Sequence, residues 1–371
     1  MNGRVIVLGT PKGHGMMAAL MVDGELEDLV IDPKNPATHP MVGDVIAARI
    51  TRKLPNKGGA FADLGDGLDG FLRDARDVTS GERTLLQVTS LPEPGKAVTV
   101  SPRVLFKGPN LILTPGTPGV NVSRQIKDME DRERLTTGAE AAMEALGIDW
   151  AGLIVRTSAT EAEGDILQSE LGELAKQAER AEAARTSAET WRDPLGSAMH
   201  VWQRDWISPP VDQILCTPDL AKTLSTEHAG RFDGLIVQDA NPLEAGGMFD
   251  ALEALSIPEV PIASGSMVIE PTKALIAVDV NTGRDFSPAA GLKTNIAAIR
   301  ELPRQLRLRG LGGQIVVDFA PMPKKERRGF EASVKAAFRR DIIETSLVGW
   351  TEMGLYELQR KRERWPLAEL L

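Results

Sequence analysis

Cysteine is nearly absent from this sequence, which contains Cys216 and no other. A single cysteine excludes an internal disulfide and any zinc site built from several cysteines of one chain, and four scattered histidines argue further against a zinc enzyme. No run approaches the roughly 20 apolar residues that cross a bilayer, and the first residues lack the layout of a signal peptide. We therefore expect a cytoplasmic protein with no zinc and no membrane partner.

A net positive charge is also lacking, because 52 Asp and Glu outnumber 43 Lys and Arg and give the 371 residues a net charge of −9. The sign is uneven: from Lys293 onward, 16 Lys and Arg stand against 10 Asp and Glu, a local net charge of +6. This asymmetry indicates a local phosphate-binding face, with the alternative that the runs KKERR and RKRER are solvated helix surfaces. A hydrophobic content of 42% over this length predicts two or more packed cores.

Two apolar runs, ALIAVDVNTGR and QIVVDFAPM, each contain an aspartate where a strand should end. Asp279 and Asp318 would leave neighbouring parallel strands at the same edge of a sheet. Carboxylate oxygens suit a hard cation, and the intervening RELPRQLRLRG supplies guanidinium groups suited to phosphate. Together they predict metal-assisted phosphodiester chemistry, with the alternative that each aspartate merely begins a loop.

The stretches VDVNTGR, KTN and RQLRLRGLGGQIVVDF resemble, in order and spacing, the catalytic core of the bacterial ribonuclease E/G family. SGSMVIEPTKAL and GLYELQRKRER extend the resemblance on both sides. It implies an endoribonuclease of RNA processing or decay that uses Mg²⁺, or alternatively Mn²⁺, to cleave single-stranded RNA with water, giving 5′-phosphate and 3′-hydroxyl ends. Asp279 and Asp318 would hold the metal, and Asn281 would orient the attacking water or the phosphate.

The resemblance also implies a multidomain fold that combines α/β and all-β parts. A ribonuclease-H-like α/β subdomain would comprise residues 1–38 and 191–263, and an inserted S1 barrel of the oligonucleotide-binding type would comprise 39–103. A 5′-sensor region with a linker helix would follow at 104–190, and a DNase-I-like α/β catalytic subdomain at 264–371. The chain lacks the family's zinc-linking cysteines and C-terminal tail, so we expect a short member without zinc-linked tetramers; a homodimer through the catalytic subdomain stays compatible with the family.

Five residues are predicted to contact RNA. S1 barrels bind single strands on aromatic platforms beside basic side chains. Phe61 and Phe71 match the family's aromatic positions and Lys96 matches a basic one, although a Phe in a small barrel is also a common core residue. Arg307 and Arg309, in the arginine-rich segment, are the other two predicted contacts.

A pocket for the 5′ monophosphate of RNA is the third predicted site, again through the resemblance. Arg156 ends the strand GLIVR and would supply a bidentate donor, while Thr157 would add its hydroxyl. Arg124 matches a family arginine beside that pocket. The alternative for Arg156 is a charge at the end of a strand.

The arginine-rich segment is predicted to be an amphipathic helix that begins at Thr294 as its N-cap and buries an apolar stripe including Ile299, Leu302 and Leu306. Pro303 lies inside it and should kink the helix at a cost of roughly 3 kcal/mol unless packing compensates.

Four residues depart from the family pattern near the predicted site. Lys273 replaces a carboxylate before the first aspartate, and Ala297, Gly310 and Pro321 stand where acidic residues are expected. We interpret the chain as a divergent, active nuclease. The alternatives are an RNA-binding relative that no longer cleaves, and a magnesium-dependent phosphohydrolase of small nucleotides, against which the S1-like module argues because a small substrate needs no stacking platform.

Overall fold

The computed structural model describes residues 2–54, 58–93, 95–187, 191–227, 230–263, 265–284, 287 and 289–371. The chain divides into two compact units: unit 1 combines Met1–Val30 with Leu215–Leu371, and unit 2 is the inserted segment Ile31–Ile214. Residue 264, where the catalytic subdomain is predicted to begin, lies outside the described residues. No helix in the described ranges is long and apolar enough to span a membrane.

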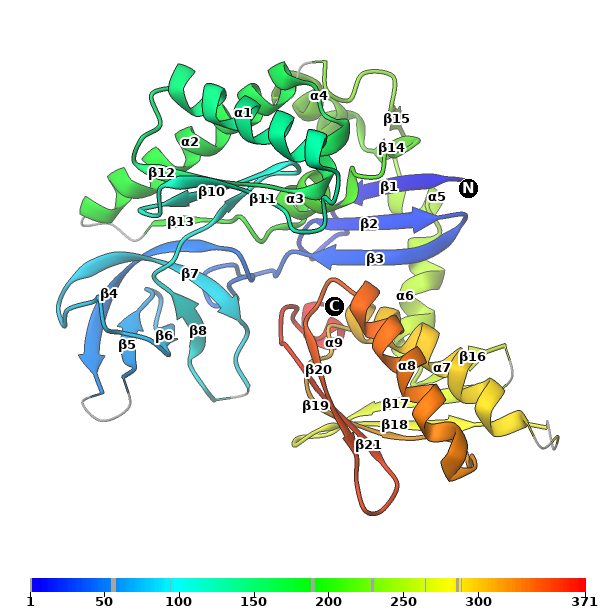
Figure 1. The fold of residues 1–371 in the computed structure, drawn as a ribbon. Helices are drawn as coiled ribbons and strands as arrows, with labels where there is room; N and C mark the ends of the chain where they lie inside the picture. The colour runs from blue at the N-terminus through cyan, green and yellow to red at the C-terminus, as the bar shows by residue number, and fades with distance from the viewer. Residues whose placement is uncertain are drawn as a thin grey trace. The chain divides into compact units, whose positions relative to one another are not determined.

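The first sheet of unit 1 has five strands in the order β15-β14-β1-β2-β3. Val5 to Leu8 of β1 are all buried, as expected for a strand covered on both faces. Strands from before and after the inserted segment share this sheet, because β14 lies beside β1 (Figure 1). Its strands are β1 (Arg4–Gly9), β2 (Met17–Val22), β3 (Glu25–Ile31), β14 (Gln213–Cys216) and β15 (Ile236–Gln238), with helices α4 (Pro218–Glu227), α5 (Pro242–Ala245) and α6 (Met248–Ser256).

The second sheet of unit 1 has six strands in the order β16-β17-β18-β19-β21-β20, and α7 and α8 pack on one of its faces. Its core joins alternate strand residues, such as Val278 and Val317, to the apolar sides of α7 and α8, which lie side by side (Figure 1). The elements are β16 (Glu259–Ile262), β17 (Gly265–Pro271), β18 (Ile276–Asn281), α7 (Ala290–Leu308), β19 (Gly313–Asp318), α8 (Lys324–Arg340), β20 (Thr345–Trp350), β21 (Tyr356–Arg360) and α9 (Leu367–Leu370).

Helix α7 begins earlier than the sequence predicts. Ala289 is its N-cap, and Thr294, the predicted cap, is fully buried inside the helix. Gly291 explains the earlier start, because a Cβ there would come within 2.0 Å of the Pro321 carbonyl oxygen, so a glycine lets the first turn pack on the chain after β19. The helix also runs through Pro303, which is buried in its interior.

Unit 2 contains a closed five-stranded barrel. The strands follow the order β4-β5-β6-β8-β7, and β7 pairs back to β4, which leaves no free edge between them. Alternate residues such as Ile46, Ala62 and Leu86 fill the interior. This arrangement is consistent with an S1 or other oligonucleotide-binding barrel. The strands are β4 (Val45–Lys53), β5 (Ala60–Asp63), β6 (Asp69–Leu72), β7 (Arg83–Ser90) and β8 (Val98–Ser101), with β13 (Trp191–Asp193) added beside β4.

A four-stranded sheet, in the order β11-β12-β10-β9, completes unit 2. Helix α2, predicted as a linker, instead buries Leu167, Leu171 and Leu174 in the core of this sheet, because its apolar stripe finds a partner surface there. Val45 of the barrel belongs to the same core. The elements are β9 (Phe106–Lys107), β10 (Leu111–Pro115), β11 (Gly119–Val122), α1 (Met129–Ala145), β12 (Ala151–Val155), the 3₁₀ turn η1 (Thr157–Glu161), α2 (Gly164–Thr186), α3 (Ala198–Val201) and the π-helical turn η2 (Trp202–Trp206).

Candidate functional site

Asp279 and Asp318 occupy equivalent positions on two neighbouring parallel strands. β18 and β19 pair so that Asp279 stands directly opposite Asp318, and adjacent strands lie about 4.8 Å apart. Val278 and Val317, one residue earlier on each strand, point into the core, so the two carboxylates project from the face opposite to the one that α7 and α8 cover. Both aspartates are exposed. The structure therefore brings the two predicted metal ligands together.

Asn281 joins this pair. Its Nδ2 donates a hydrogen bond of 2.8 Å to Oδ2 of Asp279. The two residues lie two positions apart on β18 and therefore share a face. The amide fixes the orientation of one carboxylate and leaves its own carbonyl oxygen available as an acceptor.

A buried amide holds the end of β19 in place. Asn295 of α7, fully buried, donates to the carbonyl of Ala320 and accepts from its N–H, both at 2.9 Å. Ala320 lies two residues after Asp318, so this two-way bond couples the first turns of α7 to the strand exit that carries the carboxylate. Asn295 lies within the KTN stretch, but its role could not be predicted, because a sequence does not distinguish a buried amide from one at the surface.

The donor set suits a hard divalent cation. Two carboxylates and an amide oxygen are the ligands that Mg²⁺ accepts, with water completing its octahedron. Within the described ranges, no three His, Cys, Asp or Glu side chains gather into a metal-binding group. Asp279 and Asp318, which stand opposite each other, are the pair of carboxylates that would hold Mg²⁺ or Mn²⁺.

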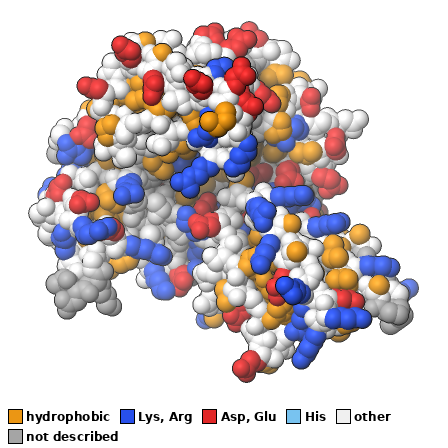
Figure 2. Space-filling model, viewed as in Figure 1, with side chains coloured by type: hydrophobic (Ala, Val, Ile, Leu, Met, Phe, Trp, Pro, Cys, Tyr) orange, Lys and Arg blue, Asp and Glu red, His pale blue; other side chains and the backbone are white. Residues whose placement is uncertain are grey.

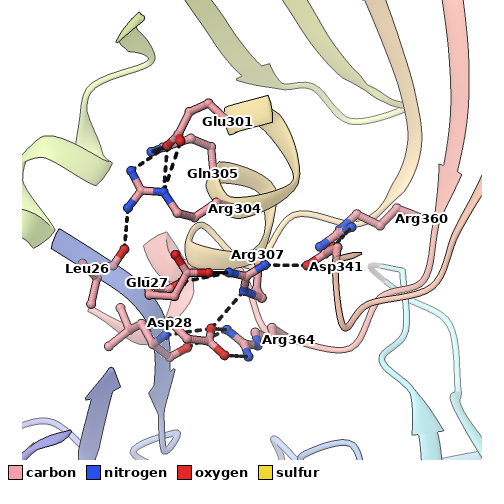
Figure 3. Close-up of polar contacts among 11 residues, drawn as sticks. Leu26, Glu27, Asp28, Glu301, Arg304, Gln305, Arg307, Asp341, Arg360 and Arg364 are labelled. Atoms are coloured by element: carbon pink, nitrogen blue, oxygen red, sulfur yellow. Dashed lines mark hydrogen bonds and ion pairs between the residues drawn. The ribbon is translucent and has the colours of Figure 1, made fainter. Parts of the chain in front are cut away.

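Arg307, predicted to contact RNA, is instead buried in a network of charges. Its guanidinium forms ion pairs with Glu27, Asp28 and Asp341 at 2.5–3.2 Å, and 7% of the residue is exposed (Figure 3). Arg364 also pairs with Asp28 at 2.5 Å. Burial raises the pKa of Asp28, but attraction to Arg364 and Arg307 outweighs it and holds that pKa below its ordinary value.

Arg309, the second predicted RNA contact on α7, also points inward. Its Nη1 and Nη2 donate to the carbonyls of Leu255 and Ile257 at 2.7 and 2.8 Å, which caps the end of α6. Arg304 donates to Glu301 and to the Leu26 carbonyl. The physical reason is that the α7 end carrying these arginines faces β3 and α6, whose carboxylates and carbonyl oxygens use the guanidinium donors that phosphate would need.

The positive surface of this part of the chain lies on α8. Its 17 residues include seven Lys and Arg against two Glu. Figure 2 shows Lys and Arg side chains gathered over the α7 and α8 layer. Arg327 stacks on Trp350 with its guanidinium carbon 4.4 Å from the ring centroid. The exposed cations of the two helices are Lys293, Arg300, Lys324, Lys325, Arg328, Lys335, Arg339 and Arg340.

The barrel presents a row of side chains across three strands. Phe61 stands opposite Phe71, with ring centroids 5.3 Å apart, and Arg52 lies opposite Phe61 with its guanidinium carbon 5.2 Å from that ring. Both rings are half-buried, so each keeps a side toward solvent. Lys96 is exposed and pairs with Glu93 at 2.6 Å. Sequence reasoning missed Arg52, which the strand register alone reveals.

The predicted sensor residues gather where β11 and β12 end. The two strands are parallel, with Val122 opposite Val155, so the segments that follow them run side by side. The hydroxyls of Thr157 and Ser123 are 3.3 Å apart, and Thr157 donates to Gln125 at 3.4 Å. Arg124, in the same segment, is exposed. Predicted neighbours on two strands are therefore close in space.

The two terminal nitrogens of the Arg156 guanidinium are hydrogen-bonded to neighbouring residues. Nη1 donates to the Gly108 carbonyl at 2.6 Å and to the Arg204 carbonyl at 3.3 Å, and Nη2 donates to Oδ1 of Asp205 at 3.3 Å. Nε has no acceptor among the described residues. Burial raises the pKa of Asp205, but Arg204 and Arg156 outweigh it and keep that pKa below its ordinary value. Sequence reasoning did not identify Asp205.

Comparison with known sequences shows which family this chain is similar to. A model of the Ribonuclease E/G family matches residues 106–363. The chain belongs to this family. Ribonuclease E of Synechocystis sp. is 30% identical over 95% of this chain and 56% of its own length. The ribonucleases G of Haemophilus influenzae and Escherichia coli K12 are 27% and 26% identical, over 95% and 100% of this chain and 78% and 82% of their own lengths. The chain thus spans about half the length of that ribonuclease E.

One of the four departures from the ribonuclease E/G pattern, Gly310, has a structural reason in this chain. Gly310 follows α7 with φ +66°, and a Cβ there would come within 2.0 Å of the Trp365 carbonyl oxygen. Pro321 supplies the carbonyl that lies against Gly291. Lys273 is exposed in the turn before β18, and Ala297 is half-buried on α7. Nothing in the structure explains the residue types of Lys273, Ala297 and Pro321.

Proposed function

We propose that this member of the ribonuclease E/G family is a Mg²⁺-dependent endoribonuclease that cleaves single-stranded RNA in RNA processing or decay. The products are 5′-phosphate and 3′-hydroxyl ends. The observation that carries the proposal is the register of β18 and β19, which sets Asp279 opposite Asp318 on the face of the sheet opposite to α7 and α8.

Each residue at the pair has a distinct task. Asp279 and Asp318 hold the cation, and Asn281 keeps the Asp279 carboxylate oriented through its 2.8 Å bond. When bound by these carboxylates, Mg²⁺ would supply positive charge at the scissile phosphate and would make water there more acidic. The carbonyl oxygen of Asn281 accepts a hydrogen bond from the attacking water and so aligns it with the phosphorus. Asn295 keeps Asp318 in place by fixing Ala320.

The substrate reaches the chain through the barrel. Bases stack on Phe61 and Phe71, and Arg52 adds positive charge at the end of the same row. Lys96 contributes an exposed cation at a turn. We revise the roles of Arg307 and Arg309 to structural ones, because their donors are used inside unit 1.

The 5′ monophosphate binds where β11 and β12 end. Arg156 offers its unengaged Nε–H, Thr157 its hydroxyl and Arg124 an exposed guanidinium. The proposed subdomain limits, the cytoplasmic location and a homodimer through the catalytic sheet follow from the family resemblance.

The deciding experiment incubates 5′-monophosphorylated single-stranded RNA with the purified chain and Mg²⁺. We expect cleavage by the wild type and a loss on the order of 10³-fold in Asp279→Asn and in Asp318→Asn, with RNA binding retained. Asp250→Asn, an exposed aspartate on α6, is the matched control and should cleave normally. Intact binding without any cleavage by the wild type would replace the proposal with a non-cleaving RNA-binding protein.

A further inference from the structure

The connection between β9 and β10 packs its carbonyl groups against the proposed sensor. Three successive carbonyls accept hydrogen bonds from the residues that flank Thr157. Gly108 accepts from Nη1 of Arg156 at 2.6 Å, Pro109 accepts from the Ser158 hydroxyl at 2.6 Å, and Asn110 accepts from the Arg156 N–H at 2.7 Å. This turn of the chain therefore sets both the backbone and the side-chain position of Arg156.

The opposite side of the turn is held by one carboxylate. Glu170 of α2 accepts from the N–H groups of Asn110 and Leu111 at 2.9 and 2.8 Å, and from the Asn110 side-chain amide at 2.9 Å. The residue is 8% exposed on an otherwise apolar helix face. A carboxylate is the group that fits, because it accepts at both oxygens and brings no donor of its own.

Gly108 lies so close to Glu170 that no side chain fits between them. A Cβ added to Gly108 would come within 2.2 Å of Oε1 of Glu170 and 2.9 Å of its Cδ. Position 108 must therefore be glycine for the turn to sit on the carboxylate. Any larger residue has to displace either Glu170 or the carbonyl that Arg156 uses.

We propose that Glu170 is a positioning residue for recognition of the RNA 5′ monophosphate. It acts through the turn at 108–111, whose donors it satisfies and whose acceptors hold Arg156 with Nε unengaged. The inference rests on the proposed role of Arg156 and Thr157 as the phosphate site. Glu170 itself does not touch the ligand.

The test compares cleavage of two RNAs of one sequence that begin with a 5′ monophosphate or a 5′ hydroxyl. We expect Glu170→Gln to lower the ratio of the two rates about tenfold, since one hydrogen bond to a charged group is worth about 1.4 kcal/mol or more. Glutamine places an N–H₂ against a donor of Asn110 and shifts the turn. Gly108→Ala should lower the ratio similarly while keeping the carboxylate. Glu173→Gln, exposed one turn along α2, should leave the ratio unchanged.

The outcomes distinguish the proposed role of Glu170 from the proposed phosphate site at Arg156 and Thr157, on which it rests. A wild-type ratio near one, unchanged in Arg156→Ala, would remove the sensor and this inference with it. A ratio that Arg156→Ala abolishes but Glu170→Gln and Gly108→Ala preserve would overturn the role of Glu170 alone. A fall in both rates together, with the ratio intact, would assign Glu170 to the stability of unit 2 and equally overturn the proposal.

Discussion

The backbone conformation and close packing at position 310 favour glycine over any other residue. Its φ is +66°, a conformation that costs other residues about 1 kcal/mol, and its missing Cβ makes room for the carbonyl of Trp365. We expect Gly310→Ala to lower the free energy of unfolding by about 2 to 4 kcal/mol in urea titration. Gly329→Ala, exposed on α8 with open space at the Cβ, should raise it by about 0.5 to 1 kcal/mol. Equal effects would contradict the close approach at Gly310.

Asp44 makes the stability of unit 2 depend on pH. The residue is 3% exposed, accepts from the N–H groups of Met41 and Gly196, and burial raises its pKa to about 6. Between pH 4 and pH 6 the folded state keeps a proton that the unfolded state has released, so stability falls as the pH rises through this window.

The measurement compares wild type with Asp44→Asn, which does not titrate. From pH 4 to pH 7 the free energy of unfolding of the wild type should fall by up to about 3 kcal/mol relative to that of the variant. A difference that is constant with pH would show that the Asp44 carboxyl titrates normally.

Side-chain positions were predictable where they depend on neighbours in the sequence. Alternation along each strand, with the rule that parallel strands end at one edge, was enough to bring Asp279 and Asp318 together. Arg307 was not predictable in this way, because Asp28, one of its partners, lies 279 residues earlier in the chain. Composition marks a guanidinium as suited to phosphate, but the partner it takes depends on tertiary packing.

Among the elements, α7 is the one that ties the two sheets of unit 1 together. Its apolar side covers the six-stranded sheet, and Arg307 pairs with Glu27 and Asp28 of β3. Removing one partner of a buried ion pair leaves the other charges buried without compensation, so Arg307→Met should lower the free energy of unfolding by about 3 to 5 kcal/mol. Arg300→Met, exposed on the same helix, should change it by less than about 0.5 kcal/mol. Matching losses in the two variants would argue against the network.

Element types were more predictable than their ends and partners. Strands β18 and β19 and the apolar stripe of α7 follow from periodicity, whereas the start of α7 at Ala290 depends on a close approach to Pro321. The stripe of α2 was visible in the sequence, but the sheet that covers it was not.

For the whole molecule, the separate cores of the two units predict two unfolding transitions. The core of unit 2 and the core of the six-stranded sheet contain different residues. In differential scanning calorimetry, Arg307→Met should lower the midpoint of the unit 1 transition and leave that of unit 2 unchanged. The pH dependence caused by Asp44 should appear in the unit 2 transition alone. A single transition that both changes shift would contradict this independence.

The Asp28–Arg364 ion pair also sets an order of events during synthesis. The two residues are 336 positions apart, which a ribosome adding about 5 to 20 residues per second covers in roughly 17 to 67 s. During that interval the N-terminal strands have emerged without the arginine that neutralises them, while the inserted unit between them has its whole sequence available. The barrel is therefore complete on the nascent chain before the sheet that carries Asp279 and Asp318 is anchored. A stalled or truncated translation product would then contain a folded barrel and lack that sheet.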